Sequence, residues 1–411
     1  MATCESLLKA AIDIAYRLNN EAIHSPDGSC SWITTGIVPG TEKYRMQPMG
    51  MFVYDGFAGV AMFLSALSTV THDPVIHRIG EAALVSLKRT IGEAEKSNRF
   101  MKMNPIGIAS GLTSLIYSFL TISDFAKDST LVDGALAISR LIDKTIVIRD
   151  NSHDVMSGNA GAILALLKLY RKTGLQEVLD KAIDCGDHLL ETAIQMPDGN
   201  MGWITVNGKA LAGFSHGVAG IAYSLLKLHE ATGNMEYYEI AAKSIRYENG
   251  LFSVENQNWA DLRVFQGTVN PDSPKFMTAW CHGAAGIGLG RMAGKPLFNN
   301  NMIESDISSA LATTRNTSLT NRDHLCCGNM GRIEAILYAA LKTNDKNLLN
   351  EACEKAGFVI ERAEKRGHYD IFADQSLDFF NPGFFQGLSG IGYEFLRLAY
   401  PDQFPSVLVF E

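Results

Sequence analysis

The sequence lacks an excess of basic residues and lacks a hydrophobic run typical of a membrane-spanning helix. Its 36 lysines and arginines are outnumbered by 44 aspartates and glutamates, which gives a formal net charge of −8. This balance argues against nucleic acid or an anionic membrane surface as a partner. Apolar stretches such as 56–71 are too short and too rich in glycine, serine and threonine to cross a bilayer. Residues 1–18 read as an amphipathic helix with charges throughout rather than as a signal peptide, so we expect a cytoplasmic protein without membrane insertion.

Seven cysteines in a chain without a secretion signal favour reduced thiols, with metal binding or catalysis as the role of the unusual ones. Cys326 and Cys327 are unusual because they are adjacent, in HLCCGNMG, where they pack poorly and form only a strained disulfide. Cys4, Cys185 and Cys353 fall in helical patterns and are most simply explained as small buried apolar residues.

The sequence repeats a short glycine motif seven times. Each copy is a Gly-x-x-Gly followed by an apolar run, as in YDGFAGVAMFLSAL from Tyr54 and SHGVAGIAYSLLKL from Ser215. A weaker copy, IASGLTSLIYSFL from Ile108, keeps one glycine, which we align as the second of the motif. The second glycines recur at intervals of 45 to 66 residues, at positions 59, 111, 161, 220, 286, 331 and 390. A motif recurring at such a spacing indicates a repeat protein.

Each motif begins a helix that is apolar on nearly every side and must therefore be buried. More amphipathic helices lie between the motifs, such as 74–91 and 175–193, and the N-terminal helix 5–23 is expected to partner the first motif helix. The last copy is as apolar as the middle ones, which favours a closed ring over an open solenoid with polar caps. The predicted fold is all-α, an α/α toroid of seven inner and seven outer helices. No proline- or serine-rich linker interrupts the chain, so we expect one domain over 1–411.

In such a ring, the residues just before the motif helices gather at one mouth. The residue before the first glycine is His216, His282 and Cys327 in three successive copies, and Cys281 and Cys326 stand one position earlier. Three thiolates without a fourth protein ligand in register are typical of catalytic zinc, because structural zinc normally takes four protein ligands. Imidazole titrates near neutrality, so we assign proton transfer to His216; a fourth zinc ligand, either His216 or His282, is the alternative.

These residues resemble a known family. AWCHG at 279–283, CCG at 326–328, SHG at 215–217 and the repeated glycine motifs look like those of the lanthipeptide cyclases, the LanC-like family. The stretch 44–67, YRMQPMGMFVYDGFAGVAMFLSAL, resembles the opening of the cyclase domain of the bifunctional class II synthetases called LanM. The resemblance covers essentially the whole chain and implies a seven-pair α/α toroid. It also implies the reaction, in which a peptide cysteine thiol adds across dehydroalanine or dehydrobutyrine to form a lanthionine or methyllanthionine ring.

The resemblance also implies roles for residues that match the family's motifs. Zn²⁺ would be held by Cys281, Cys326 and Cys327. His216 matches the histidine assigned to acid/base work, and Asp154 matches an aspartate near that histidine and the metal.

Two positions depart from the family's commonest pattern. The third ligand is often histidine but is Cys327 here, and the residue after the first ligand is often tyrosine but is His282 here, where it is a possible substrate contact. The implied partners are a dehydrated lanthipeptide precursor, made of a leader and a core peptide, and a dehydratase or dehydratase domain that supplies its dehydro residues. The sequence shows no dehydratase region.

Three other functions remain open. A toroid glycosidase needs two facing carboxylates, and the mouth offers Asp55 and Asp154 among thiols and imidazoles. A prenyltransferase-like zinc enzyme on the same fold typically uses an Asp/Cys/His metal site. A non-catalytic binder of thiols or glutathione is the third, and the expected proton-transfer role of His216 argues against it.

Overall fold

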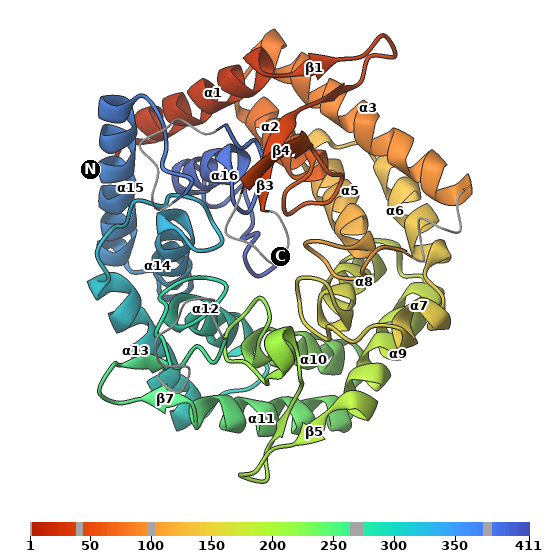
Figure 1. The fold of residues 1–411 in the computed structure, drawn as a ribbon, viewed down its shortest axis with the longest axis vertical. Helices are drawn as coiled ribbons and strands as arrows, with labels where there is room; N and C mark the ends of the chain where they lie inside the picture. Colours follow the sequence, from red (N-terminus) through yellow and green to blue (C-terminus); the bar gives the residue numbers. More distant parts are fainter. Residues whose placement is uncertain (1, 38–43, 97–102, 264–273, 373–379) are drawn as a thin grey trace.

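The helices form a closed ring of two layers in the computed structural model, which describes residues 2–37, 44–96, 103–263, 274–372 and 380–411 (Figure 1). Seven helices form the inner layer of the described chain: α2 (Phe57–Val70), α5 (Leu112–Ala126), α8 (Asn159–Thr173), α10 (Val218–Thr232), α12 (Ala284–Gly294), α14 (Asn329–Thr343) and α16 (Leu388–Ala399). Seven form the outer layer: α1 (Cys4–Asn20), α3 (Pro74–Lys96), α6 (Thr130–Leu141), α9 (Gln176–Thr192), α11 (Met235–Asn249), α13 (Asn301–Asn316) and α15 (Lys346–Arg366). Each inner helix packs against the next around the ring, and α16 packs against α2. The predicted α/α toroid is therefore confirmed.

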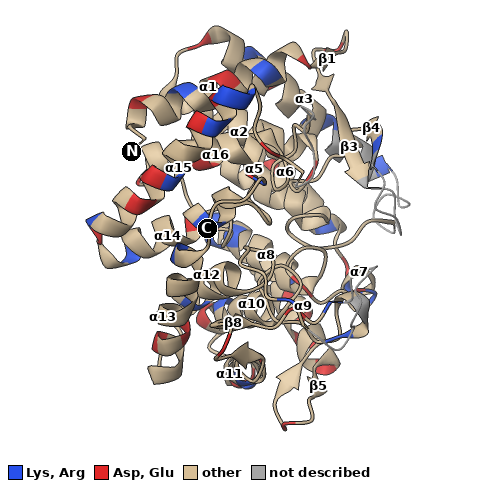
Figure 2. Ribbon diagram, turned by 60° about the vertical axis from the view of Figure 1, so that its left-hand side comes forward, with Lys and Arg blue, Asp and Glu red and all other residues tan. Residues whose placement is uncertain are grey.

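The two layers differ in how much of each helix is buried. Helix α5 is buried along almost its whole length, whereas α9 buries one stripe that includes Val178, Ala182 and Leu189. The charged residues gather on the outer helices, and the inner helices carry fewer (Figure 2). This distribution follows from the sequence pattern, because only an amphipathic helix has a face that water can solvate.

The N-terminal helix has a different partner from the one expected. Helix α1 packs mainly along α16, the last inner helix, whereas the first inner helix α2 packs against the outer helix that follows it, α3. The other pairs have the same order, an inner helix followed by its outer partner. The outer partner of the last inner helix is thus supplied by the start of the chain, which joins the two ends of the ring.

The register of the weak glycine motif also differs from the predicted one. Gly111 is the N-cap of α5, as the first glycines Gly56, Gly158 and Gly217 are the N-caps of their helices. Gly111 therefore corresponds to the first glycine of the motif, and Ser114 takes the place of the second. A copy with one glycine fits the pattern in two registers, and the predicted one is wrong.

The second glycines allow a close approach of backbone that a side chain would prevent. A Cβ at Gly286 would lie 1.8 Å from the carbonyl oxygen of Trp280, six residues earlier, and a Cβ at Gly220 would lie 2.0 Å from that of Phe214. The loop before each helix is thus folded back onto the first turn. Gly283 has a positive φ of 85°, a conformation that glycine adopts readily.

Short hairpins and the last residues of the chain complete the ring. The paired strands are β1 (Ile23–His24) with β2 (Cys30–Ser31), β3 (Ile33–Ile37) with β4 (Tyr44–Pro48), β5 (Ile194–Gln195) with β6 (Met201–Gly202), and β7 (Phe252–Ser253) with β8 (Asn258–Trp259). The short helices α7 (Lys144–Ile148) and η1 (Val206–Gly208) lie in the connections. Residues 404–411 run into the centre of the ring (Figure 1), where Phe410 is buried against Tyr117 and Trp280.

In the described part of the chain, none of the helices combines the length and the apolarity that a bilayer crossing needs.

Candidate metal centre and proton-transfer pair

Seven equivalent residues at the mouth, the end of the ring where the inner helices begin, are joined by a closed circle of backbone hydrogen bonds. Each lies two positions before the N-cap glycine of its inner helix. We call these seven residues the backbone belt. The N–H of each belt residue donates to the carbonyl of the next: Met156 to Ser215 (3.3 Å), Ser215 to Cys281 (3.2 Å), Cys281 to Cys326 (3.3 Å), Cys326 to Phe385 (2.9 Å), Phe385 to Tyr54 (2.9 Å), Tyr54 to Ala109 (2.9 Å) and Ala109 to Met156 (3.3 Å).

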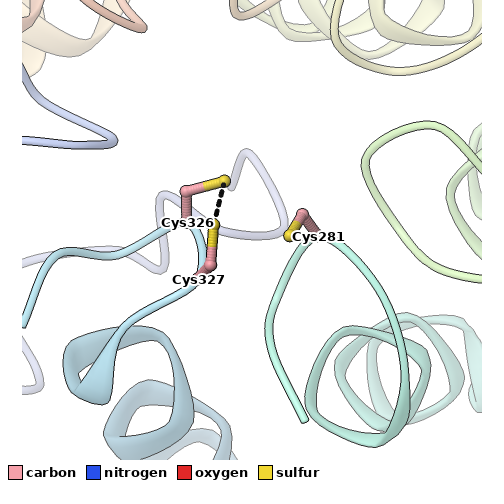
Figure 3. A group of neighbouring side chains, drawn as sticks. All are labelled: Cys281, Cys326 and Cys327. Carbon is pink, nitrogen blue, oxygen red and sulfur yellow. Dashed lines mark hydrogen bonds between the residues drawn. The ribbon is translucent and has the colours of Figure 1, made fainter. Parts of the chain in front are cut away.

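The belt brings the three expected cysteines together. The sulfur atoms of Cys281, Cys326 and Cys327 all lie within 4.8 Å of one another, and those of Cys326 and Cys327 are 3.6 Å apart. Cys281 comes from the loop before α12 and the other two from the loop before α14 (Figure 3). The convergence that the repeat register predicted is therefore observed.

This donor set fits a zinc ion. Thiolates around a tetrahedral zinc, with Zn–S bonds of about 2.3 Å, lie about 3.8 Å apart, close to the spacing of these sulfurs. Among the described residues, no fourth histidine, cysteine or carboxylate belongs to the cluster. Hydrogen bonding with Cys281 and Cys326 holds the pKa of the Cys327 thiol well below its usual range, whereas the pKa values of the Cys281 and Cys326 thiols are raised. The cluster can thus give up a first proton readily, as binding of a cation requires.

His216 and Asp154 form a hydrogen-bonded pair beside the cluster. The Nδ1 atom of His216, one residue before the N-cap of α10, donates to Oδ2 of Asp154 over 2.6 Å. Asp154 is 2% exposed, and its other oxygen accepts from the backbone N–H of Ser157 over 2.8 Å. The side chain of His216 is 28% exposed. A buried carboxylate therefore orients an imidazole that remains open to the mouth, an arrangement suited to proton transfer.

The loop that carries His216 is held by a buried carboxylate on an outer helix. Glu248, on α11, accepts from the backbone N–H of Gly213 over 2.8 Å and from that of Ala219 over 3.1 Å. Its other oxygen pairs with the buried guanidinium of Arg291 on α12, over 2.6 Å. The charge of Glu248 is thus compensated while it fixes the start of α10.

His282, the residue after Cys281, is fully buried beside His216. Its Nδ1 atom donates to the carbonyl of Ala212 over 3.1 Å, and its ring lies 6.0 Å from that of His216. Burial, together with the positive charge of Arg263, lowers the pKa of His282 to about 4. The imidazole is therefore neutral at physiological pH. Its Nε2 atom is buried without a hydrogen-bond partner in the described structure.

Sequence reasoning missed one side chain of the site, Tyr54. Its hydroxyl donates a hydrogen bond to the sulfur of Cys326 over 3.2 Å, and burial raises the pKa of Tyr54 well above its usual range. The motif register contained the signal, because Tyr54 stands two positions before Gly56, as Cys281 stands before Gly283. The residue expected at the mouth from this copy was its neighbour, Asp55.

Comparison with known proteins gives three kinds of match. A sequence model of the family described as lanthionine synthetase C-like protein matches residues 47–409. The "Lacticin 481/lactococcin biosynthesis protein LcnDR2" of Lactococcus lactis subsp. lactis is 22% identical over 410 residues, which are 96% of this chain and 41% of that protein. The chain thus spans about two fifths of the length of this relative.

Two solved structures share the fold. Nisin cyclase superposes with a TM-score of 0.67 at 16% identity and covers 88% of this chain and 92% of its own. The glycoside hydrolase family 76 mannosidase Bt3792 from Bacteroides thetaiotaomicron superposes with a TM-score of 0.50 at 11% identity, over 96% of this chain and 98% of its own. At such identities these likenesses show the toroid alone, which occurs with unlike chemistries.

The family match rests on the sequence and extends over nearly the whole chain, including every residue of the belt, the three clustered cysteines and the His216–Asp154 pair. The chain belongs to the lanthionine synthetase C-like protein family.

Proposed function

We propose that this protein is a zinc-dependent lanthionine and methyllanthionine cyclase. It would add the cysteine thiols of a dehydrated precursor peptide to dehydroalanine and dehydrobutyrine in the same peptide. The observation that carries the proposal is the juxtaposition of three sulfur atoms within 4.8 Å of one another and the hydrogen-bonded His216–Asp154 pair at one mouth. The addition needs a site that activates the thiol of the substrate peptide and a group that donates a proton.

Zn²⁺ would be held by Cys281, Cys326 and Cys327. Soft thiolates select Zn²⁺ over Mg²⁺ or Ca²⁺. Bound zinc would supply an open position for the substrate thiol and lower that thiol's pKa, so that it is deprotonated at neutral pH. The buried positions of Cys281 and Cys326 keep bulk water from their own sulfur atoms, and Cys327 is partly exposed.

The proton needed at the end of the addition would come from His216. The substrate sulfur forms a bond to the β-carbon, the electron pair of the carbon–carbon double bond moves onto the α-carbon and its carbonyl, and the enolate takes a proton at the α-carbon. With Nδ1 of His216 bonded to Asp154, Nε2 is the nitrogen left to exchange that proton. Asp154 stabilises the imidazolium form and fixes the plane of the ring. Neutral His282, stacked beside His216, is fully buried, which argues against its being the proton donor and against the substrate contact expected from its place in the motif.

The wider setting follows from this chemistry. Residues 1–411 would act as one cyclase domain, and the substrate would be a leader–core precursor peptide. A dehydratase, or a dehydratase domain, must first convert serine and threonine of the core into dehydro residues. The thiols of both enzyme and substrate must stay reduced, which places the reaction in the cytoplasm.

The proposal is tested with a dehydrated peptide that contains one free cysteine. Cyclization leaves the mass unchanged, so the measurement is the loss of alkylation of the peptide thiol, followed by mass spectrometry. We expect alkylation to be lost with the protein and to persist with the Cys281→Ala/Cys327→Ala double variant. Cys185→Ala is the matched control, because Cys185 is a buried cysteine on the outer helix α9.

The same assay separates a cyclase from a non-catalytic thiol binder. A non-catalytic thiol binder would protect the thiol only while bound, so alkylation would return once the protein is denatured. A thioether survives denaturation. Return of the thiol after denaturation, with the protein in excess over peptide, would rule out the cyclase.

A further inference from the structure

The backbone belt puts Tyr54 in the same structural position as two of the clustered cysteines. Tyr54, Cys281 and Cys326 each lie two residues before an N-cap glycine, and each takes part in the circle of backbone hydrogen bonds. The side chains of these equivalent positions are presented at the same mouth. A tyrosine two repeats beyond Cys326 therefore reaches the cluster.

The ring of Tyr54 is fixed from several sides. It stacks on Phe385 with ring centroids 5.3 Å apart and an interplanar angle of 13°. Its backbone N–H donates to Ala109, and its carbonyl accepts from Phe384 (3.2 Å) and Phe385 (2.9 Å). Because the belt holds its backbone and Phe385 stacks on its ring, the direction of the hydroxyl is set before any metal binds.

The hydroxyl points at one sulfur of the cluster. It lies 3.2 Å from the sulfur of Cys326, within reach of a hydrogen bond to sulfur. A tyrosine hydroxyl keeps its proton at neutral pH, and a thiolate can only accept, so Tyr54 is the donor. Three thiolates on a divalent cation leave one negative charge, and a substrate thiolate adds another. A neutral donor aimed at a protein sulfur offsets part of that charge without occupying the position left for substrate.

We propose that Tyr54 is a positioning residue of the metal centre: its hydroxyl fixes the sulfur of Cys326 and draws electron density from it. The inference rests on the proposed function, in that it takes the three cysteines as zinc ligands. Hydrogen-bonding partners of metal ligands commonly change metal affinity by about 10–100-fold when they are removed.

The test replaces Tyr54 by phenylalanine, which removes the hydroxyl and keeps the stacked ring. We expect Tyr54→Phe to bind Zn²⁺ about 10–100-fold more weakly than the unchanged protein in competition with a chromogenic chelator. With Co²⁺ in place of Zn²⁺, the sulfur-to-cobalt charge-transfer band should move to lower energy, because the sulfur of Cys326 becomes more electron-rich. Tyr117→Phe is the matched control, since Tyr117 is a buried tyrosine on α5 whose hydroxyl has no hydrogen-bond partner in the described structure.

The band position separates a specific hydrogen bond from a general structural effect. Weaker binding with an unmoved cobalt band, or a band shift of equal size in Tyr117→Phe, would overturn the inference. Unchanged affinity and an unchanged band in Tyr54→Phe would do the same while leaving the zinc assignment standing. If the unchanged protein binds neither metal, the proposed zinc site fails and this inference fails with it.

Discussion

At the scale of single residues, the proposed zinc site depends on three sulfur atoms. Replacing Cys281 and Cys327 by alanine leaves one thiol, which cannot hold Zn²⁺ tightly, so we expect the double variant to contain almost no zinc after purification without chelators. Elemental analysis should give one zinc per chain for the unchanged protein and for Cys185→Ala. Full zinc in the double variant would refute the ligand assignment.

His216 can be tested separately from the metal. His216→Asn keeps a polar side chain near Asp154 but removes the titrating nitrogen. We expect this variant to keep its zinc and its thermal stability but to cyclize about 10²–10⁴-fold more slowly, the usual effect of losing a general acid. The rate is measured by loss of peptide thiol alkylation. His24→Asn, at an exposed histidine of the β1–β2 hairpin, is the matched control.

Two results would contradict the role of His216. Loss of zinc in His216→Asn would make His216 a metal ligand. An unchanged rate with full zinc would move the proton donor elsewhere, and Asp154→Asn would then be the next variant to measure.

The site could be predicted from the sequence only as far as the repeat register reached. Cys281 and Cys326 stand two positions, and His216 one position, before the first glycine of their motifs, so counting from the glycines brought them together. Asp154 lies 62 positions from His216 and outside the motif, so its pairing was implied by the family resemblance alone. Tyr54 was missed because nothing in its identity reveals a contact with a residue 272 positions away.

At the scale of secondary-structure elements, Gly286 allows the loop that carries Cys281 to pack closely on the start of helix α12. A Cβ there would lie 1.8 Å from the carbonyl oxygen of Trp280, whereas a Cβ at Gly92 on the outer helix α3 would have none of the described atoms within 4 Å. Gly286→Ala must therefore displace the loop that carries Cys281. We expect a lower melting temperature, equivalent to about 1–3 kcal/mol of overpacking, and weaker zinc binding.

Gly92→Ala is the control for that prediction. Alanine is favoured over glycine inside a helix by about 1 kcal/mol, so this variant should melt at the same temperature or higher and bind zinc normally. Equal destabilisation by the two substitutions would show that the contact at Trp280 has no special effect.

The helices were easier to predict than their partners. The all-apolar runs after the glycines identified the inner helices, because no other element buries every side of a four-turn segment. The single glycine at Gly111 was compatible with two registers, and only the cap position in the folded chain decides between them. The partner of α1 depends on closure of the ring, which joins residues at opposite ends of the sequence and leaves no local pattern.

Closure of the ring affects the whole molecule. Helix α1 lies against α16 and joins the first and last repeats, with Leu7, Ile14 and Leu18 buried in the contact layer. In an open solenoid, a weakened terminal helix frays while the other repeats keep their neighbours. In a closed ring, every inner helix has a neighbour on both sides. Weakening the contact between α1 and α16 therefore destabilises the first and the last repeat at once.

Ile14→Ala distinguishes these two cases. Ile14 is 2% exposed, and its truncation should cost about 2–5 kcal/mol. In the closed ring we expect one unfolding transition at a lower temperature, with faster amide hydrogen exchange in α16 and α2 as well as in α1. Met235→Ala, at a side chain that is 52% exposed on the outer helix α11, should change neither measurement. Faster exchange confined to α1, with the main transition unmoved, would mean that the ring is held by its other six pairs and that α1 only covers it. The zinc site would respond in the first case alone, because Tyr54 and Phe385, on either side of the closure, belong to the belt that holds Cys326.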